Sequence, residues 1–242
     1  MARPVSYIVF TDFDGTMMQV DVGDEMFQRF GRRDECIELF NRYRNGEITA
    51  RECWISECST VEFLKRETLE SFAREKLLSG GFHEFVRYCK GRDIPIHILS
   101  DGFDAYIDVV LAREGLSHIP RHSNELQFLP DGKIAPLFPH TDAECSRCAN
   151  CKRNHVLSLS SDDHVIVYIG DGYSDQCPAR YADIIFAKKA LLSFCEKENI
   201  TYHRFETFHD VLKKFQEIVE SSAGGRPRRT AVLARKEIFI QE

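Results

Sequence analysis

Two carboxylates near the N-terminus have the spacing that nucleophilic and acid–base chemistry requires. Asp12 and Asp14 flank Phe13 directly after a short apolar run. Carboxylates this close repel each other, so the pair is costly unless a cation neutralises it or one of them holds a proton, and either condition suits catalysis. One can attack a substrate while the other handles protons. Gly15 and Thr16 add a turn and a hydroxyl that can serve a phosphate oxygen.

Further polar candidates follow later apolar runs. Ser100 follows a second run, Asp171 and Asp175 follow a third, and Lys152 stands shortly before the third. The ammonium group of a lysine can neutralise both a nucleophilic carboxylate and a phosphoryl group. If the runs are parallel strands, their carboxyl ends meet at the edge where open α/β sheets bind ligands. This set of residues is suited to phosphoryl transfer.

Four apolar, β-branched runs are expected to be the buried strands that position these residues. They cover residues 5–11, 94–99, 164–169 and 184–187. Segments with helical spacing, including residues 103–114, separate them, and this alternation predicts an α/β fold with a parallel sheet. Residues 124–137 contain Pro130-Asp131-Gly132 between short alternating runs, which predicts a hairpin.

A long helical insertion is expected between the first two strands. It covers residues 18–80, so the Rossmann-like core consists of residues 1–17 and 81–222. Residues 223–242 are expected to form a C-terminal tail that starts with a flexible basic linker and then adds a peripheral strand or stays loose.

Composition and charge favour a small soluble partner. The 242 residues are 43% hydrophobic, which is ordinary for a folded protein, and the formal charge of −6 gives no broad basic surface for nucleic acid or anionic lipid. No apolar run approaches the roughly 20 residues that span a bilayer. The N-terminus lacks the regions of a secretory signal. We therefore expect a cytoplasmic monomer or homodimer that binds neither nucleic acid nor membranes.

Three of the nine cysteines form a cluster, which consists of Cys145, Cys148 and Cys151. Their spacing is that of metal ligands, so a structural Zn²⁺ is one interpretation. Zinc would need a fourth ligand, for which the candidates are His140, Asp142 and His155. The alternatives are reduced thiols in a tight loop that positions Lys152, and a transient disulfide.

The ordered motifs resemble those of the haloacid dehalogenase superfamily. They are Asp12-Phe-Asp-Gly-Thr, Ser100-Asp-Gly-Phe-Asp, Lys152 and Gly170-Asp-Gly-Tyr-Ser-Asp175. Each motif alone is weak, but their order and their places after buried strands are specific. The resemblance implies the haloacid dehalogenase fold, a C1-type helical cap over the active site as in subclass IB, Mg²⁺, and an aspartyl-phosphate intermediate.

The resemblance also implies a role for each matching residue. Asp12 is the nucleophile, Asp14 the general acid and base, and Lys152 a third catalytic residue. The implied phosphate-binding residues are Ser100, Asp101, Gly102 and Lys152. The implied metal ligands are Asp12, the Asp14 backbone carbonyl, Asp171 and Asp175, the last as an outer ligand or as an orienting partner for Lys152. A carboxylate at position 14 can protonate a leaving alcohol and then activate water, which favours a phosphatase.

A narrower resemblance is to the phosphoserine phosphatases and especially to the 2-hydroxy-3-keto-5-methylthiopentenyl-1-phosphate phosphatases of methionine salvage. Pro139-His140 and the cysteine cluster ahead of Lys152 carry it. Against phosphoserine as substrate, Asp101 follows Ser100 where phosphoserine phosphatases have glycine, and only Asp21 matches their acidic cap residue.

The expected function is therefore Mg²⁺-dependent hydrolysis of a small phosphorylated metabolite, with the methionine-salvage enol phosphate as the candidate substrate. The alternatives are phosphoserine phosphatase-like or other small-metabolite phosphatase activity, phosphoryl transfer to an acceptor other than water, and a non-catalytic relative that binds a phosphorylated metabolite or a partner protein.

Overall fold

The computed structural model describes residues 6–143, 145, 147–221 and 226–241. The chain divides into two compact units. The first consists of Met1–Asp12, Leu78–Leu99 and Lys152–Glu242, and the second consists of Phe13–Leu77 and Ser100–Cys151.

A parallel sheet forms the centre of the first unit. Its strands are β1 (Ser6–Thr11), β2 (Ile96–Phe103), β5 (His164–Gly170), β6 (Ile184–Ala187) and β7 (His203–Arg204), in the order β2-β1-β5-β6-β7. The residues of β2 from Ser100 onward belong to the second unit. All neighbouring pairs are parallel. Because Thr11 pairs with Ile169, β1 and β5 end together, and Asp12 and Asp171 follow at the same edge. The four strands expected from the sequence are confirmed, with shifted ends.

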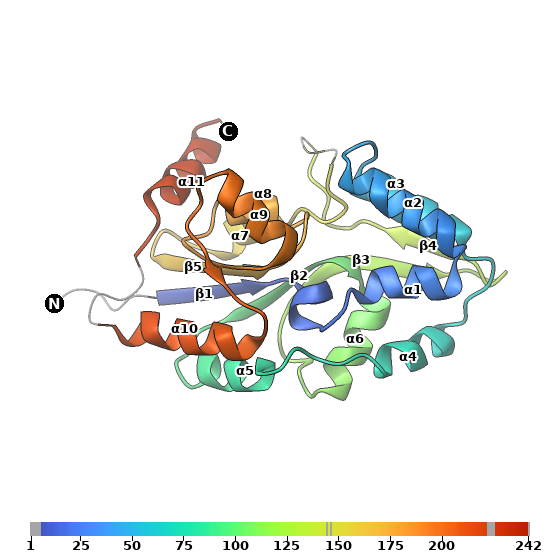
Figure 1. The fold of residues 1–242 in the computed structure, drawn as a ribbon, viewed down its shortest axis with the longest axis horizontal. Coiled ribbons are helices and arrows are strands. Elements are labelled where there is room, and N and C mark those ends of the chain that lie inside the picture. The colour runs from blue at the N-terminus through green and yellow to red at the C-terminus, as the bar shows by residue number, and fades with distance from the viewer. Residues whose placement is uncertain (1–5, 144, 146, 222–225, 242) are drawn as a thin grey trace. The chain divides into compact units, whose positions relative to one another are not determined.

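Helices cover one face of this sheet. They are α7 (Lys152–Leu159), α8 (Gln176–Ala179) and α9 (Lys189–Lys197), seen in Figure 1. Ile8 and Phe10 of β1 pack into the same apolar cluster as side chains of β5 and of these helices. Successive side chains of a strand point to opposite faces, so strands as continuously apolar as β1 and β5 require cover on both sides.

The opposite face is covered by α5 (Phe82–Lys90) and α10 (Phe208–Glu220) (Figure 1). Tyr7 of β1 meets the ring of Phe215 edge-on, with the ring centroids 5.6 Å apart. The first unit is therefore a three-layer α/β core, as the alternation of strands and helices predicts.

The C-terminal segment differs from the expectation. Residues 229–241 form a helix, α11 (Arg229–Gln241), so the prediction of a peripheral strand or a loose end is wrong. Arg235 of α11 contacts the Asp183 carboxylate at 3.2 Å, and the Arg228 amide donates to the same carboxylate. These contacts join residues that are far apart in the sequence, and they fix the segment on the first unit.

The second unit is mainly helical. Its helices are α1 (Val22–Phe30), α2 (Arg33–Arg44), α3 (Ala50–Thr60), α4 (Arg66–Arg74) and α6 (Asp104–Arg113). Within it, α2 packs on α3, and α4 packs on α6. The helical character expected between the first two strands is confirmed. Residues 100–151 group with these helices in one unit, whereas the sequence analysis places them in the core. The division into a core, a cap over residues 18–80 and a tail stays a prediction.

A hairpin completes the second unit. Strands β3 (Arg121–Phe128) and β4 (Ile134–Leu137) are antiparallel, as predicted. In the strand order, β3 is the neighbour of β2. Gly132 in their turn has φ +84°, a conformation that favours glycine. Across the described residues, no helix has the length and apolar character needed to cross a membrane. The cytoplasmic location stays a prediction.

Candidate active site

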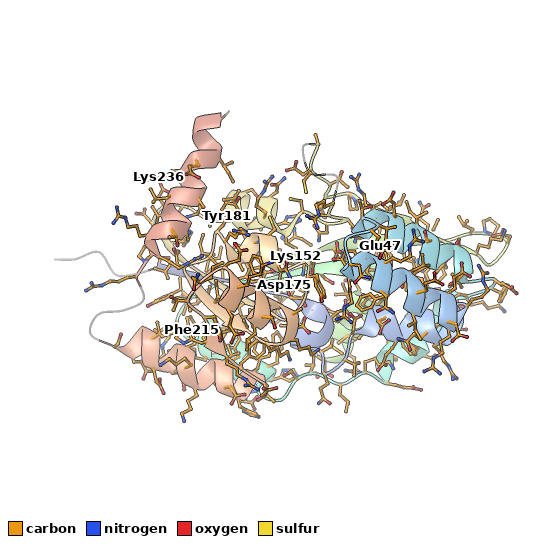
Figure 2. All side chains as sticks on the ribbon, turned by 45° about the horizontal axis from the view of Figure 1, so that its top comes forward. Glu47, Lys152, Asp175, Tyr181, Phe215 and Lys236 are labelled. Carbon is orange, nitrogen blue, oxygen red and sulfur yellow. The ribbon has the colours of Figure 1, made fainter. Side chains whose placement is uncertain are left out.

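Lys152 is buried between two carboxylates of the first unit. Its Nζ donates to Asp12 Oδ1 at 2.6 Å and to Asp175 Oδ1 at 2.8 Å. Lys152 and Asp175 are both buried, and Figure 2 labels them close together. Burial by itself lowers the pKa of a lysine, but the charges of Asp12 and Asp175 outweigh it and raise the pKa of Lys152 well above its ordinary value. Lys152 is therefore a permanent positive charge beside Asp12.

The Asp175 carboxylate is fully occupied. Its Oδ1 also accepts from Tyr168 Oη at 2.7 Å, and its Oδ2 accepts from the backbone amides of Asp171 and Gly172, both at 2.9 Å. An ionised carboxylate offers about four acceptor positions, so Lys152 and these three donors use all of them. Of the two roles expected for Asp175, the geometry favours the partner that orients Lys152 over the metal ligand.

A glycine makes room for this carboxylate. A Cβ atom at Gly170 would lie 2.5 Å from Asp175 Oδ2 and 2.6 Å from its Cγ, closer than carbon atoms approach in folded proteins. Gly170 is the last residue of β5. The glycine that precedes Asp171 is therefore required by the space that Asp175 needs.

Asp12 and Asp171 form the part of the cluster that could hold a cation. One carboxylate oxygen from each of Asp12, Asp171 and Asp175 lies within 4.8 Å of the others. Burial raises the pKa of Asp12, the charges of Asp175 and Asp171 raise it further, and Lys152 offsets this only in part. Such crowding of buried carboxylates is what a divalent cation relieves, and an all-oxygen donor set is the kind that Mg²⁺ prefers.

Asp171 is held from a second side. Burial and the charge of Asp175 raise its pKa, and Lys189, whose Nζ lies 2.8 Å from Asp171 Oδ2, acts against them. Lys189 opens α9 with φ +47°, an uncommon conformation for a residue other than glycine. This lysine is a charge in the cluster that the sequence analysis did not identify.

Asp14 lies in the second unit, in a separate set of hydrogen bonds. Its Oδ1 accepts from the Val22 amide at 2.9 Å, at the start of α1, where a helix favours a negative charge. Its Oδ2 accepts from Tyr106 Oη at 2.7 Å and from Ser100 Oγ at 3.3 Å. The next residue, Gly15, has φ +67° and turns the chain toward α1.

Two asparagines fix the Ser100 motif, which forms the end of β2. Asn150 donates from its side-chain Nδ2 to the Ser100 carbonyl at 2.7 Å and from its backbone amide to Asp101 Oδ1 at 2.8 Å. Asn124 Nδ2 donates to the Asp101 carbonyl at 2.6 Å, and the Gly102 amide donates to Ser100 Oγ at 3.0 Å. The Asp101 side chain thus ties the end of β2 to Asn150, a role that suits a carboxylate better than contact with an anionic phosphate.

The cysteine cluster gives no support for zinc. Cys145 Sγ and Cys148 Sγ are 3.9 Å apart, and the Cys145 amide donates to Asp142 Oδ1 at 3.0 Å. Within the part of the chain that the structure describes, no set of three ligand atoms close enough to share an ion includes Cys145, Cys148 or Cys151. The expectation of structural Zn²⁺ is therefore not carried further.

The sequence-predicted residues thus form two groups. The structure brings Asp12, Lys152, Asp171 and Asp175 together in the first unit, and it brings Asp14, Ser100, Asp101 and Gly102 together in the second. Sequence reasoning missed Tyr106, Tyr168, Lys189 and Asn150. Only Tyr168 left a signal, as a hydroxyl between the apolar residues of β5.

Fold and side chains define a class: an α/β protein with a buried cluster of carboxylates and a lysine at the carboxyl edge of a parallel sheet. Residues 9–180 match the haloacid dehalogenase-like hydrolase family. The chain belongs to this family, as the ordered motifs predict.

Relatives with curated names agree with the narrower resemblance. Over 92% of this chain and 100% of its own length, Pdp3-interacting factor 1 of Schizosaccharomyces pombe is 31% identical. A 2-hydroxy-3-keto-5-methylthiopentenyl-1-phosphate phosphatase of Bacillus thuringiensis is 30% identical over 89% of this chain and 99% of its own. The expected enzyme class, a phosphomonoester hydrolase of the haloacid dehalogenase type, agrees with the family and with the phosphatase relatives.

Solved structures confirm the fold. A phosphoserine phosphatase determined as a phospho-aspartyl intermediate analogue has a TM-score of 0.66 at 20% identity, covering 86% of this chain and 98% of that one. The phosphoserine phosphatase of T. onnurineus has a TM-score of 0.65 at 18% identity, covering 88% and 96%. At these identities the similarity establishes the haloacid dehalogenase fold.

Proposed function

We propose that this hydrolase is a Mg²⁺-dependent phosphatase that cleaves a small phosphomonoester through an aspartyl-phosphate intermediate. The observation that carries the proposal is the buried Asp12 carboxylate, 2.6 Å from the permanently charged Lys152 and grouped with Asp171 and Asp175. A nucleophile for phosphoryl transfer needs this combination, a carboxylate kept from water and a positive charge to offset an incoming phosphate.

The reaction assigns one step to each of two carboxylates. An oxygen of Asp12 attacks phosphorus, the bond from phosphorus to the leaving oxygen breaks, and Asp14 gives that oxygen a proton. Asp14 then takes a proton from water, the resulting hydroxide attacks the phosphorus of the aspartyl phosphate, and inorganic phosphate leaves with Asp12 regenerated. Asp14 begins and ends the cycle protonated, so no outside acid or base is consumed.

The remaining residues bind and orient. Lys152 and Ser100 donate to the phosphoryl oxygens, with the Gly102 amide as a further donor, while Asp101 holds the end of β2 that carries Ser100 and Gly102. Asp175 keeps Lys152 in place. Asp12 and Asp171 would hold the Mg²⁺, with the Asp14 backbone carbonyl as a third ligand. When bound there, Mg²⁺ supplies positive charge that offsets the carboxylates and the dianionic phosphate.

The relatives suggest the substrate. Several proteins at 29% to 30% identity are named 2-hydroxy-3-keto-5-methylthiopentenyl-1-phosphate phosphatase, and they match over nearly their whole length. We therefore propose the methionine-salvage enol phosphate as the first substrate to test among small phosphorylated metabolites.

A second candidate function rests on one relative. Pdp3-interacting factor 1, at 31% identity, is named for an interaction with a protein. A partner-binding role would not need the buried pair of Asp12 and Lys152, and removing two charges from water costs free energy. The pair therefore favours catalysis as the first hypothesis.

The decisive experiment compares Asp12→Asn with the native protein on p-nitrophenyl phosphate and on the enol phosphate, in Mg²⁺ with and without chelator. We expect Asp12→Asn to lose roughly a thousandfold or more in kcat, because the nucleophile is removed. The matched control, Asp162→Asn, changes an exposed aspartate and should keep full activity. Trapped turnover should place the phosphoryl group on Asp12 by mass spectrometry.

Two results would contradict the proposal. Full activity of Asp12→Asn would exclude Asp12 as the nucleophile, and activity that survives the chelator would exclude the Mg²⁺ requirement. A native protein inactive on every phosphomonoester tested, yet able to capture a protein partner, would favour the second candidate.

A further inference from the structure

Tyr106 is buried against Asp14 and has no place in the sequence motifs. It lies in α6 and has no exposed surface. Its Oη donates to Asp14 Oδ2 at 2.7 Å, closer than Ser100 Oγ at 3.3 Å. The shorter distance is the usual length of a hydrogen bond between two oxygen atoms, and the longer one is beyond the usual range. Tyr106 is therefore the strongest side-chain restraint that the described contacts place on this carboxylate.

The protein keeps space open for the tyrosine hydroxyl. A Cβ atom at Gly102 would collide with Tyr106 Oη and would lie 2.5 Å from Asp14 Oδ2. A Cβ atom at Gly23 would lie 3.1 Å from the same hydroxyl. These two glycines belong to β2 and α1, so different elements leave room for one oxygen atom. Packing is therefore one reason for glycine at position 102, in addition to the donor role proposed for its backbone amide.

The restraint acts on both oxygens of the carboxylate. Oδ1 is held by the Val22 amide at 2.9 Å and Oδ2 by Tyr106, so rotation of the Asp14 side chain would break one of the two bonds. Burial raises the pKa of Tyr106 well above its ordinary value, and the charges of Asp14 and Asp21 raise it further. The phenol therefore stays protonated and remains a donor.

We propose that Tyr106 is a positioning residue that fixes the direction in which Asp14 delivers and accepts protons. The proposal rests on the proposed function, in which Asp14 is the general acid and base. A general acid must lie within hydrogen-bond reach of the leaving oxygen, and a displacement of about 1 Å can cost a hundredfold in rate. The tyrosine proton stays on Oη throughout, and only Asp14 exchanges protons with the substrate and water.

The test is Tyr106→Phe, which removes the hydroxyl and keeps the ring. On an alkyl phosphate such as glycerol 2-phosphate, whose leaving group needs a proton, we expect kcat to fall roughly 10- to 100-fold with little change in KM. On p-nitrophenyl phosphate, whose leaving group needs no proton, we expect the rate of phosphoenzyme formation to fall only about two- to threefold. A general loss of folded protein would lower both rates equally.

The matched control is Tyr88→Phe. Tyr88 has a buried hydroxyl that makes no hydrogen bond in the described structure, and its ring packs on Phe215. Removing it deletes the same atom from the same residue type, and both rates should stay within about twofold of the native ones, because no reacting group contacts it. A control that shows the same leaving-group difference as Tyr106→Phe would overturn the proposal.

A double variant separates this inference from the proposed function. In an Asp14→Asn background, the added Tyr106→Phe change should lower kcat by no more than about twofold, because the group it positions is already gone. Equal losses on the two substrates, or an undiminished loss in the Asp14→Asn background, would overturn the role of Tyr106. Full alkyl phosphatase activity of Asp14→Asn alone would instead overturn the role of Asp14 in the proposed function.

Discussion

Glu57 makes the stability of the second unit dependent on pH. It lies in α3, is only 3% exposed and has Cys53, one turn earlier, as its hydrogen-bond partner. Burial, followed by the charges of Asp24 and Asp21, raises the pKa of Glu57 to about 8. The folded chain therefore keeps a proton on this carboxyl at pH values where the unfolded chain has released it.

The sign and size of the effect follow from this difference. Because the folded pKa is raised, the contribution of Glu57 to stability is fully present below its unfolded pKa of roughly 4.3 and is lost as pH rises toward about 8. At about 1.4 kcal/mol for each pH unit in that interval, raising pH from 5 to 8 should cost about 3 to 4 kcal/mol of unfolding free energy. Glu57→Gln cannot ionise, so it should gain this amount relative to the native protein over the same range.

The assay is urea denaturation at a series of pH values between 5 and 8.5, followed by tryptophan fluorescence. The chain has a single tryptophan, Trp54, which lies in the same helix as Glu57 and packs on Phe27 and Phe103. The control is Glu38→Gln, an exposed glutamate of α2, which should give a difference within about 0.5 kcal/mol at every pH. A Glu57→Gln difference that stays constant between pH 5 and 8 would refute the reasoning.

Two further predictions concern the Asp175 carboxylate. Asp175→Asn should lower the unfolding free energy by about 3 to 5 kcal/mol, because an amide group cannot accept all four donors and leaves Lys152 in a buried site with one partner fewer. Tyr168→Phe, which removes one of the four donors to Asp175, should lower the unfolding free energy by about 1 kcal/mol. Urea denaturation of both variants measures the difference, and equal losses would contradict the interpretation that Asp175 accepts all four hydrogen bonds. Gly170→Ala should reduce kcat by roughly tenfold or more, because the added Cβ displaces Asp175 and with it Lys152. The control is Gly46→Ala, where a Cβ meets no neighbouring atom but φ is +76°, so this change should cost stability and leave kcat unchanged. A native kcat for Gly170→Ala would show that the site adapts to the added atom.

The sequence predicts those parts of the protein that depend on local patterns. Strand β6 covers the predicted residues 184–187, because a short apolar run between turn residues has few other stable arrangements in an α/β protein. The order of the acidic motifs was also informative, since each motif follows a strand of the same parallel sheet. Asp12 and Asp171 are neighbours for this reason, although 159 positions separate their numbers.

Contacts between distant residues could not be predicted in this way. Tyr106 and Asp14 are 92 positions apart, and nothing in the periodicity of α6 indicates that one of its side chains meets a carboxylate. The same holds for Asn150 and Ser100, 50 positions apart. The cysteine spacing is a different case, because spacing alone does not show whether further ligand atoms join the pair of Cys145 and Cys148.

The C-terminal segment shows how the chain end contributes to the first unit. Arg228 donates from its guanidinium to the carbonyls of Ala179, Arg180 and Ala182, where α8 ends and β6 has not yet begun. A shortened protein that stops after α10 would retain every side chain assigned to the reaction, yet it would leave these carbonyls and the buried Asp183 without their cationic donors. Recombinant versions intended for enzymology should therefore retain the residues through Gln241, and loss of solubility on trimming them would reflect these carbonyls and Asp183 left without partners and not damage to the chemistry.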